Sequence, residues 1–190
     1  MNTLGIDLLT LAGHKFYAPK GIGVLYVRRG TPLRPLMAGG GQERGLRPGT
    51  ENVPAIAGLG MAARLVRNNL AREAHRMERL RERLHRRLAD TIPGIVLNGS
   101  SDHHLPSTLN LSFPGVRGGD LLAKATGVCA STGSACHGEI SLPSPVLRAM
   151  GLPEDRAMGA IRLSLGRFTT PDAIDRASVA LIDSWRRLVS

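Results

Sequence analysis

The sequence predicts an α/β fold, because short apolar strands alternate along the chain with segments of helical periodicity. Residues 22–27, "IGVLYV", form a partly β-branched apolar run beside glycine and arginine, which is typical of a buried strand. Residues 107–113, "STLNLSF", and 160–165, "AIRLSL", alternate apolar with polar side chains and are predicted to be half-buried strands. The second alternation places Arg162 and Ser164 together on the face opposite the apolar side chains.

Two helices are predicted from capping signals and apolar spacing. The first opens at Asn52 and Pro54, since proline suits a first turn, and extends, with or without a break, to Pro93. Its apolar residues at helical spacing are Leu70, Met77, Leu80, Leu84 and Leu88. The last helix opens with Thr170 as its cap and Pro171 next. Its inward stripe consists of Ile174, Ala177, Leu181, Trp185 and Leu188.

The beginning of the chain differs from the rest. Residues 37–50, "MAGGGQERGLRPGT", are too rich in glycine for a helix or a strand and are predicted to form a loop. The strand and loop before the first long helix contain too little sequence to complete a sheet of their own. We therefore expect this segment to be the tail of a larger domain.

The net charge of +10 requires that nucleic-acid binding be considered. Nine arginines fall between Arg64 and Arg87, opposed there by three glutamates. One interpretation is the solvated cationic face of the first long helix, and the other is a surface that contacts phosphates. The stretch has no aromatic residue on which a base could stack, so we expect no nucleic-acid partner.

No stretch approaches the length of a membrane span, and the N-terminus lacks the cationic region and cleavage site of a signal peptide. Two cysteines without an export signal favour a reduced compartment. We therefore expect a cytoplasmic protein without a membrane partner.

Two residues are candidates for chemistry. Cys136 lies in "STGSACHGE", residues 131–139, a run of small, loop-forming residues that suits an accessible, reactive thiolate. Lys15 follows His14 at the end of an apolar run, where desolvation would prepare its amine to form a Schiff base. The alternative for Lys15 is an ordinary lysine that extends from a strand end to water.

Five stretches occur in order along the chain: "LAGHKFYAPKGIGVLYVRRG", "GGGQERGLRPGTEN", "STGSACHGE", "SPVLRAMGL" and "IRLSLGRFTT". In this order and at these separations they resemble the cysteine desulfurases of the class-V aminotransferase family, which use pyridoxal phosphate. The resemblance covers nearly the whole chain and implies the C-terminal part of a fold-type-I transferase. Residues 1–60 would be the tail of the large cofactor-binding domain, and residues 61–190 the small C-terminal α/β domain.

The resemblance also implies roles for five residues. Lys15 is similar to the lysine that holds the cofactor and then moves the substrate α-proton, and His14 to the pocket histidine before it. Thr50 resembles the threonine that reaches the cofactor phosphate of the neighbouring subunit, which implies a homodimer. Arg162 resembles the arginine that binds the substrate carboxylate, a role that suits its planar fork of donors. Cys136 resembles the nucleophile that takes the sulfur.

The implied reaction removes sulfur from L-cysteine, leaves a persulfide on Cys136 and releases L-alanine. Eleven residues separate Cys136 from Arg148, which resembles the long-loop branch of the family. Members of that branch pass sulfur to acceptor proteins, so the resemblance implies a sulfur-acceptor partner and a role in iron–sulfur cluster or thio-cofactor assembly.

The sequence departs from the family pattern near its start. Ala12 stands where many relatives have a serine that binds the cofactor phosphate. In the family, the aspartate that pairs with the pyridine nitrogen lies upstream of the lysine, and Asp7 is too close to Lys15 to be that residue. We therefore expect a desulfurase whose N-terminal half is missing and which is inactive as an isolated half. The alternatives are a truncated, non-catalytic interaction module and, within the family, a selenocysteine lyase.

Cys129 is expected to end a buried strand as a small apolar residue, while a disulfide with Cys136 stays open as an alternative. A zinc site built from Cys129, Cys136 and His137 lacks the C-x-x-C spacing, so no metal site is predicted. His103 and His104 lie in a polar turn, where we expect both to be exposed.

Overall fold

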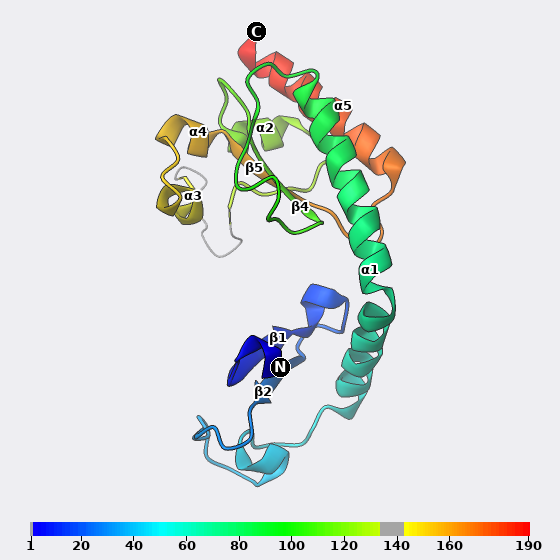
Figure 1. The fold of residues 1–190 in the computed structure, drawn as a ribbon, viewed down its shortest axis with the longest axis vertical. Helices are drawn as coiled ribbons and strands as arrows, with labels where there is room; N and C mark the ends of the chain where they lie inside the picture. Colours follow the sequence, from blue (N-terminus) through cyan, green and yellow to red (C-terminus); the bar gives the residue numbers. More distant parts are fainter. Residues whose placement is uncertain (1, 134–142) are drawn as a thin grey trace. The chain divides into compact units, whose positions relative to one another are not determined.

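The computed structural model describes residues 2–133 and 143–190, so Cys136 lies outside the described residues. The chain divides into two compact units, Met1–Leu70 and Ala71–Ser190, here called the N-terminal unit and the C-terminal unit (Figure 1). Helix α1, Val53–Ala89, is a continuous helix of 37 residues that belongs to both units.

A two-stranded antiparallel hairpin organises the N-terminal unit. Strand β1, Leu8–Ala12, pairs with β2, Gly23–Val27, so the strand predicted at 22–27 is confirmed. The expectation that this strand is buried is wrong, because Val24 and Leu25 are 40% and 49% exposed in a two-stranded hairpin. Three short 3-10 helices accompany the hairpin: Asn2–Leu4, Gly13–Phe16 and Gln42–Gly45.

Little of the N-terminal unit is buried. Its core cluster has three buried residues: Ala18, Leu59 and Ala62. Both faces of the hairpin keep apolar side chains exposed: Leu8, Leu11, Val24 and Leu25. A two-stranded hairpin is marginally stable in water unless another element covers it, so this unit lacks the burial that it needs to be stable alone.

Helix α1 begins where the capping signals predict. The side-chain Oδ1 of Asn52 accepts a hydrogen bond from the Ala55 N–H at 3.2 Å, which is the geometry of an N-cap. In the C-terminal unit the helix buries Leu80, Leu84 and Leu88 and exposes arginines, including Arg79 and Arg86, on its other side. The predicted amphipathic helix is therefore confirmed in the C-terminal unit, whereas Leu70, also expected on its apolar side, is 63% exposed.

The C-terminal unit contains a three-stranded antiparallel sheet in the order β3-β4-β5. Its strands are β3, Val96–Leu97; β4, Thr108–Ser112; and β5, Ala160–Ser164. The apolar face of β4 and β5 carries four buried residues: Leu109, Leu111, Ile161 and Leu163. Arg162 and Ser164 lie on the other face, so the predicted alternation is confirmed.

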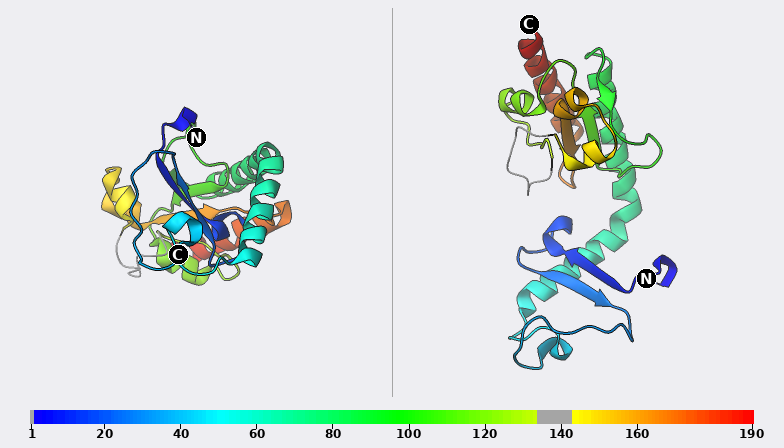
Figure 2. Two further views of the ribbon diagram at one scale, coloured as in Figure 1. Left: turned by 90° about the horizontal axis from the view of Figure 1, so that it is seen from below. Right: turned by 90° about the vertical axis from the view of Figure 1, so that its left-hand side faces the viewer.

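Helices α1 and α5, Pro171–Val189, lie side by side in the C-terminal unit (Figures 1 and 2), and both contribute to its core. The predicted cap of α5 is confirmed, since Thr170 Oγ1 accepts a hydrogen bond from the Ala173 N–H at 3.1 Å. The core cluster also includes Leu121 from α2, Gly118–Lys124. Two further short helices, α3 (Pro145–Ala149) and α4 (Glu154–Met158), pack together around Leu147 and Ala157.

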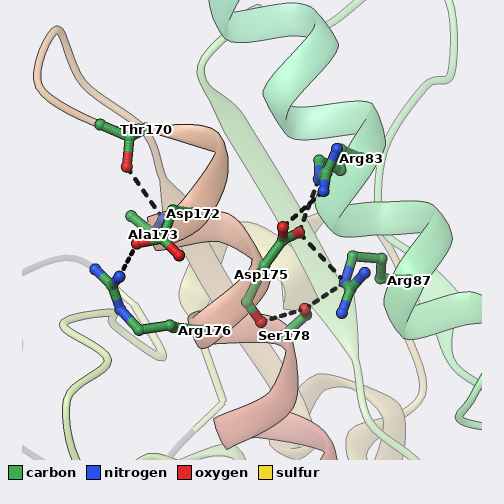
Figure 3. A network of polar contacts seen from close by, with 8 residues as sticks. All are labelled: Arg83, Arg87, Thr170, Asp172, Ala173, Asp175, Arg176 and Ser178. Carbon is green, nitrogen blue, oxygen red and sulfur yellow. Dashed lines mark hydrogen bonds and ion pairs between the residues drawn. The ribbon is translucent and has the colours of Figure 1, made fainter.

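A charged network joins α1 to α5 (Figure 3). The Arg83 guanidinium donates hydrogen bonds to both carboxylate oxygens of Asp175, at 2.7 and 2.6 Å. Arg87 lies 3.6 Å from the same carboxylate and donates a hydrogen bond to Ser178 Oγ at 2.7 Å. Hydrogen bonding to Arg83 holds the pKa of Asp175 below its ordinary value, and the same pair raises the pKa of Arg83.

Two expectations about polar residues are wrong. Cys129 is an exposed free thiol outside the strands, because its neighbours Val128 and Ala130 pack against the core and turn the residue between them outward. His104 is largely buried, with its Nε2 3.7 Å from Glu78 Oε1, because the 99–107 turn folds against α1. Within the described residues, no helix is long and apolar enough to cross a membrane.

Candidate active site

The polar face of the C-terminal sheet is the first part of the candidate site, and Arg162 lies in its edge strand β5. Arg162 exchanges two backbone hydrogen bonds with Ser131: its N–H donates to Ser131 O at 2.7 Å, and the Ser131 N–H donates to Arg162 O at 3.3 Å. No described residue accepts a hydrogen bond or ion pair from the Arg162 guanidinium. Among the described residues, the fork of donors of half-buried Arg162 is therefore unpaired, which suits an anionic group such as a carboxylate.

Ser131 is the first residue of the stretch "STGSACHGE". Its Oγ accepts a hydrogen bond from the Gly133 N–H at 3.2 Å and donates one to Gly133 O at 2.6 Å, which forms a tight turn. The structure thus fixes the start of the cysteine-containing stretch beside Arg162. Cys136 itself lies outside the described residues.

The loop that follows β5 is held by an arginine that the sequence analysis did not single out. The Arg76 guanidinium donates hydrogen bonds to three backbone carbonyls of this loop: Thr169 at 2.7 Å, Gly166 at 3.1 Å and Arg167 at 3.1 Å. Glu73 pairs with the same guanidinium at 3.0 Å. Arg76 lies about ninety residues from these carbonyls in the chain, so no local sequence signal identified the contact.

Lys15 and His14 lie together in the 3-10 helix Gly13–Phe16, which is part of the connection from β1 to β2. The Gly13 N–H donates to Ile22 O at 3.0 Å, and a Cβ on Gly13 would lie 2.7 Å from that oxygen. Only glycine allows this close approach, so it fixes the helix that carries Lys15 against β2.

The Lys15 side chain is exposed, and no described residue accepts a hydrogen bond or ion pair from its amine. The apolar surroundings expected from the sequence are therefore not supplied by the N-terminal unit itself. A free primary amine is the group that forms a Schiff base with an aldehyde, so the donor chemistry of this segment fits an aldehyde cofactor such as pyridoxal phosphate.

Thr50 is exposed in the same unit, at the end of a glycine-rich loop with a defined backbone. The Arg47 guanidinium donates to Gly49 O at 2.9 Å and to Thr50 O at 3.0 Å. The Gly49 N–H donates to Gln42 Oε1 at 3.1 Å. These contacts leave the Thr50 hydroxyl on the surface, where it is available to a group from outside this loop.

The described part of the N-terminal unit has three carboxylates: Asp7, Glu43 and Glu51. Asp7 pairs with Arg28 at 2.9 Å, while Glu43 and Glu51 lie at opposite ends of the 42–52 loop. None of the three lies on the 3-10 helix of Lys15. The described part of this unit thus supplies an amine that would hold the cofactor. It supplies no obvious carboxylate to pair with a pyridine nitrogen.

An arginine on the polar face of a sheet, a surface lysine amine and a small-residue stretch with a cysteine are the groups that a transferase with an aldehyde cofactor would use. The sequence profile of the family described as "Aminotransferase class-V" matches residues 1–177. The chain therefore belongs to the class-V aminotransferase family, whose members generally depend on pyridoxal phosphate.

The chain is similar to proteins named cysteine desulfurases. It is 48% identical over 190 residues to "Cysteine desulfurase" of Nostoc sp., an alignment that covers 99% of this chain and 48% of that protein. A solved "NifS-like protein" superposes with a TM-score of 0.85 at 36% identity and covers 96% of this chain and 47% of that one. The structure "SspA in complex with cysteine" gives a TM-score of 0.65 at 35% identity, covering 89% of this chain and 46% of that one.

The chain spans about half the length of the curated relatives it matches. The predicted family and fold class are confirmed by these comparisons. The roles of Lys15, His14, Thr50, Arg162 and Cys136, and the division into residues 1–60 and 61–190, stay predictions.

Proposed function

We propose that this chain is the C-terminal half of a pyridoxal-phosphate-dependent cysteine desulfurase, which takes sulfur from L-cysteine and releases L-alanine. The observation that carries the proposal is the pairing of Arg162 with Ser131, because it places an arginine without a partner among the described residues beside the start of the cysteine-containing stretch. The identity with cysteine desulfurases and the superposition on a protein in complex with cysteine support the same substrate.

In this proposal the residues of the chain divide the work. Arg162 binds the substrate carboxylate and so orients the amino acid. The Lys15 amine holds the cofactor and moves the proton at the substrate Cα, beside His14. The cofactor, when bound, supplies the electron sink that makes this proton acidic. The Cys136 thiolate attacks the substrate sulfur, so that an S–S bond forms on Cys136 as the C–S bond of the substrate breaks.

A complementing polypeptide half completes the site. It would supply the carboxylate for the pyridine nitrogen, which the described part of the N-terminal unit lacks, and cover the exposed apolar faces of β1 and β2. Thr50 would reach the cofactor phosphate of the neighbouring subunit in a homodimer. The persulfide would pass to an acceptor protein for iron–sulfur cluster or thio-cofactor assembly.

The test is transfer of isotopically labelled sulfur from L-cysteine to the chain in the presence of pyridoxal phosphate and a complementing N-terminal half of a cysteine desulfurase. We expect one added sulfur atom on Cys136, detected by peptide mass spectrometry, and none in a Cys136→Ala variant. Cys129→Ala is the matched control, because Cys129 is also an exposed free thiol, and it should leave the transfer unchanged. Label on Cys129, or no label on either cysteine, contradicts the proposal.

A further inference from the structure

A row of polar residues that includes Arg162 crosses the C-terminal sheet. Asn110 of β4 lies directly opposite Arg162 of β5, and Asn98 follows β3 and donates its backbone N–H to Asn110 O at 2.9 Å. Ser131 lies on the far side of Arg162. Residues opposite each other in antiparallel strands share a face, so the four side chains lie in one line across the sheet.

The pattern of backbone hydrogen bonds shows that Asn110 and Arg162 belong to the more closely spaced class of antiparallel pairs. Both backbone groups of Arg162 are used by Ser131, and the backbone of Asn110 points toward Asn98. Asn110 and Arg162 therefore form a non-hydrogen-bonded pair, the class in which the Cα atoms are only about 4.5 Å apart and the side chains are nearest.

A partly buried network determines which way the Asn110 amide faces. Arg156 Nε, which can only donate, gives a hydrogen bond to Asn98 Oδ1 at 2.9 Å. The other end of the Asn98 amide must then be its nitrogen, which donates to Asn110 Oδ1 at 2.8 Å and to Ser112 Oγ at 2.7 Å. Ser112 Oγ completes the network by donating to Arg156 O at 2.7 Å. The Asn110 oxygen is thus held toward Asn98, and its nitrogen is the free end.

The free end of Asn110 has no partner within the described residues. No described residue accepts a hydrogen bond from its Nδ2, and among them the one fully buried side-chain polar atom without a partner is His104 Nδ1. The Asn110 Nδ2 is therefore not fully buried, and it lies on the same face as Arg162, whose guanidinium has no partner among the described residues. Two donors on neighbouring residues of one face, both without a partner in the described part of the chain, fit a single anionic acceptor.

We propose that Asn110 is a second substrate-binding residue, which donates a hydrogen bond from Nδ2 to the carboxylate bound by Arg162, with its amide oriented by Asn98 and Arg156. This inference rests on the proposed function, because it takes the ligand of Arg162 to be the carboxylate of an amino-acid substrate. It gives Asn98 and Arg156 the part of positioning residues, since they act through the orientation of Asn110.

The test follows the side-chain NMR signals of Arg162 Nε–H and Asn110 Nδ2–H in the 190-residue chain during titration with L-alanine. L-alaninamide, which lacks the carboxylate, is the comparison ligand. We expect both signals to shift with one common midpoint for L-alanine and neither to shift for L-alaninamide. Asn110→Ala should raise the dissociation constant of L-alanine about tenfold, the usual effect of one hydrogen bond to a charged group.

Two variants separate this role from a structural one. Thr108→Ala is the matched control, since Thr108 lies on the same strand and face, opposite Ser164, and it should leave the dissociation constant unchanged. Asn98→Asp keeps the acceptor for Arg156 but cannot donate to Asn110 Oδ1. It should turn the Asn110 nitrogen away from Arg162 and weaken L-alanine binding as much as Asn110→Ala does.

The outcomes distinguish this inference from the proposed function. One outcome is that Arg162→Ala abolishes L-alanine binding while Asn110→Ala has the same dissociation constant as the unaltered chain. This result would show that Arg162 binds the carboxylate without Asn110, and it would overturn the inference only. An unaltered chain whose Arg162 signal does not respond to L-alanine would overturn this inference, while sulfur transfer to Cys136 with the complementing half present would still support the proposed function.

Discussion

The two units of this chain differ most in how much of their apolar surface they bury. The C-terminal unit has a core cluster of fourteen buried residues from its sheet and helices, whereas the N-terminal unit has three. In the N-terminal unit Leu36 is 97% exposed, and both faces of the hairpin carry exposed apolar residues. The difference shows that the C-terminal unit can hold Arg162 and its neighbours in place by its own packing, while the unit of Lys15 needs a covering partner.

The largest expected effect comes from the core of the C-terminal unit. Leu111→Ala removes a side chain that is completely buried and should lower the free energy of unfolding by about 2–5 kcal/mol. Trp185 is the one tryptophan of the chain, and its Nε1 donates to Pro114 O at 2.9 Å, so its fluorescence reports on this unit during urea denaturation. Leu36→Ala is the matched control and should leave the urea midpoint of the fluorescence transition unchanged. Equal shifts of the midpoint in the two variants would contradict the contrast between the units.

Hydrogen exchange should show the same contrast without a mutation. We expect the amides of β4 and β5 to exchange by opening of the whole C-terminal unit, and those of β1 and β2 to exchange much faster. Mass spectrometry of peptides from the two sheets measures both in a single sample. Equal protection of the two sheets would contradict the difference in burial.

A smaller effect is expected for the arginine that holds the loop after β5. Arg76→Ala removes hydrogen bonds to three carbonyls and should lower the free energy of unfolding by about 1–3 kcal/mol. Arg79→Ala, one turn along the same helix and exposed, should change it by less than about 0.5 kcal/mol. A similar loss in both variants would mean that charge on α1, rather than the contacts of Arg76, stabilises the unit.

The smallest effect concerns the exposed network between α1 and α5 and depends on pH. Arg83 lowers the pKa of Asp175 in the folded chain, so the pair stabilises the fold above the ordinary aspartate pKa of about 3.9. This contribution is lost as the pH falls through the lowered pKa, because protonated Asp175 no longer pairs. Asp175→Asn should therefore lower the melting temperature slightly at pH 7, and the difference from the unaltered chain should vanish in acid. A difference that persists at low pH would contradict this origin.

Local signals in the sequence predicted many of the helices and strands but not the long-range hydrogen bonds around the candidate site. The alternation in residues 107–113 and the Thr170 cap are properties of neighbouring residues, so both were predictable. The contacts of Arg76 with the 166–169 loop and of Asn98 with Asn110 depend on how distant elements pack, which periodicity does not encode. Cys129 was wrongly expected to end a buried strand, because the side chains that pack against the core there are those of its neighbours Val128 and Ala130.

The central claim is that Lys15 becomes the cofactor lysine when the N-terminal unit is covered by its complementing half. The most direct measurement is borohydride trapping of pyridoxal phosphate, with the labelled lysine identified by peptide mass spectrometry. The chain has only three lysines, so Lys20 and Lys124 are built-in controls for non-specific labelling. We predict that the complementing half concentrates the label on Lys15, whereas equal labelling of the three lysines with that half bound would contradict the account.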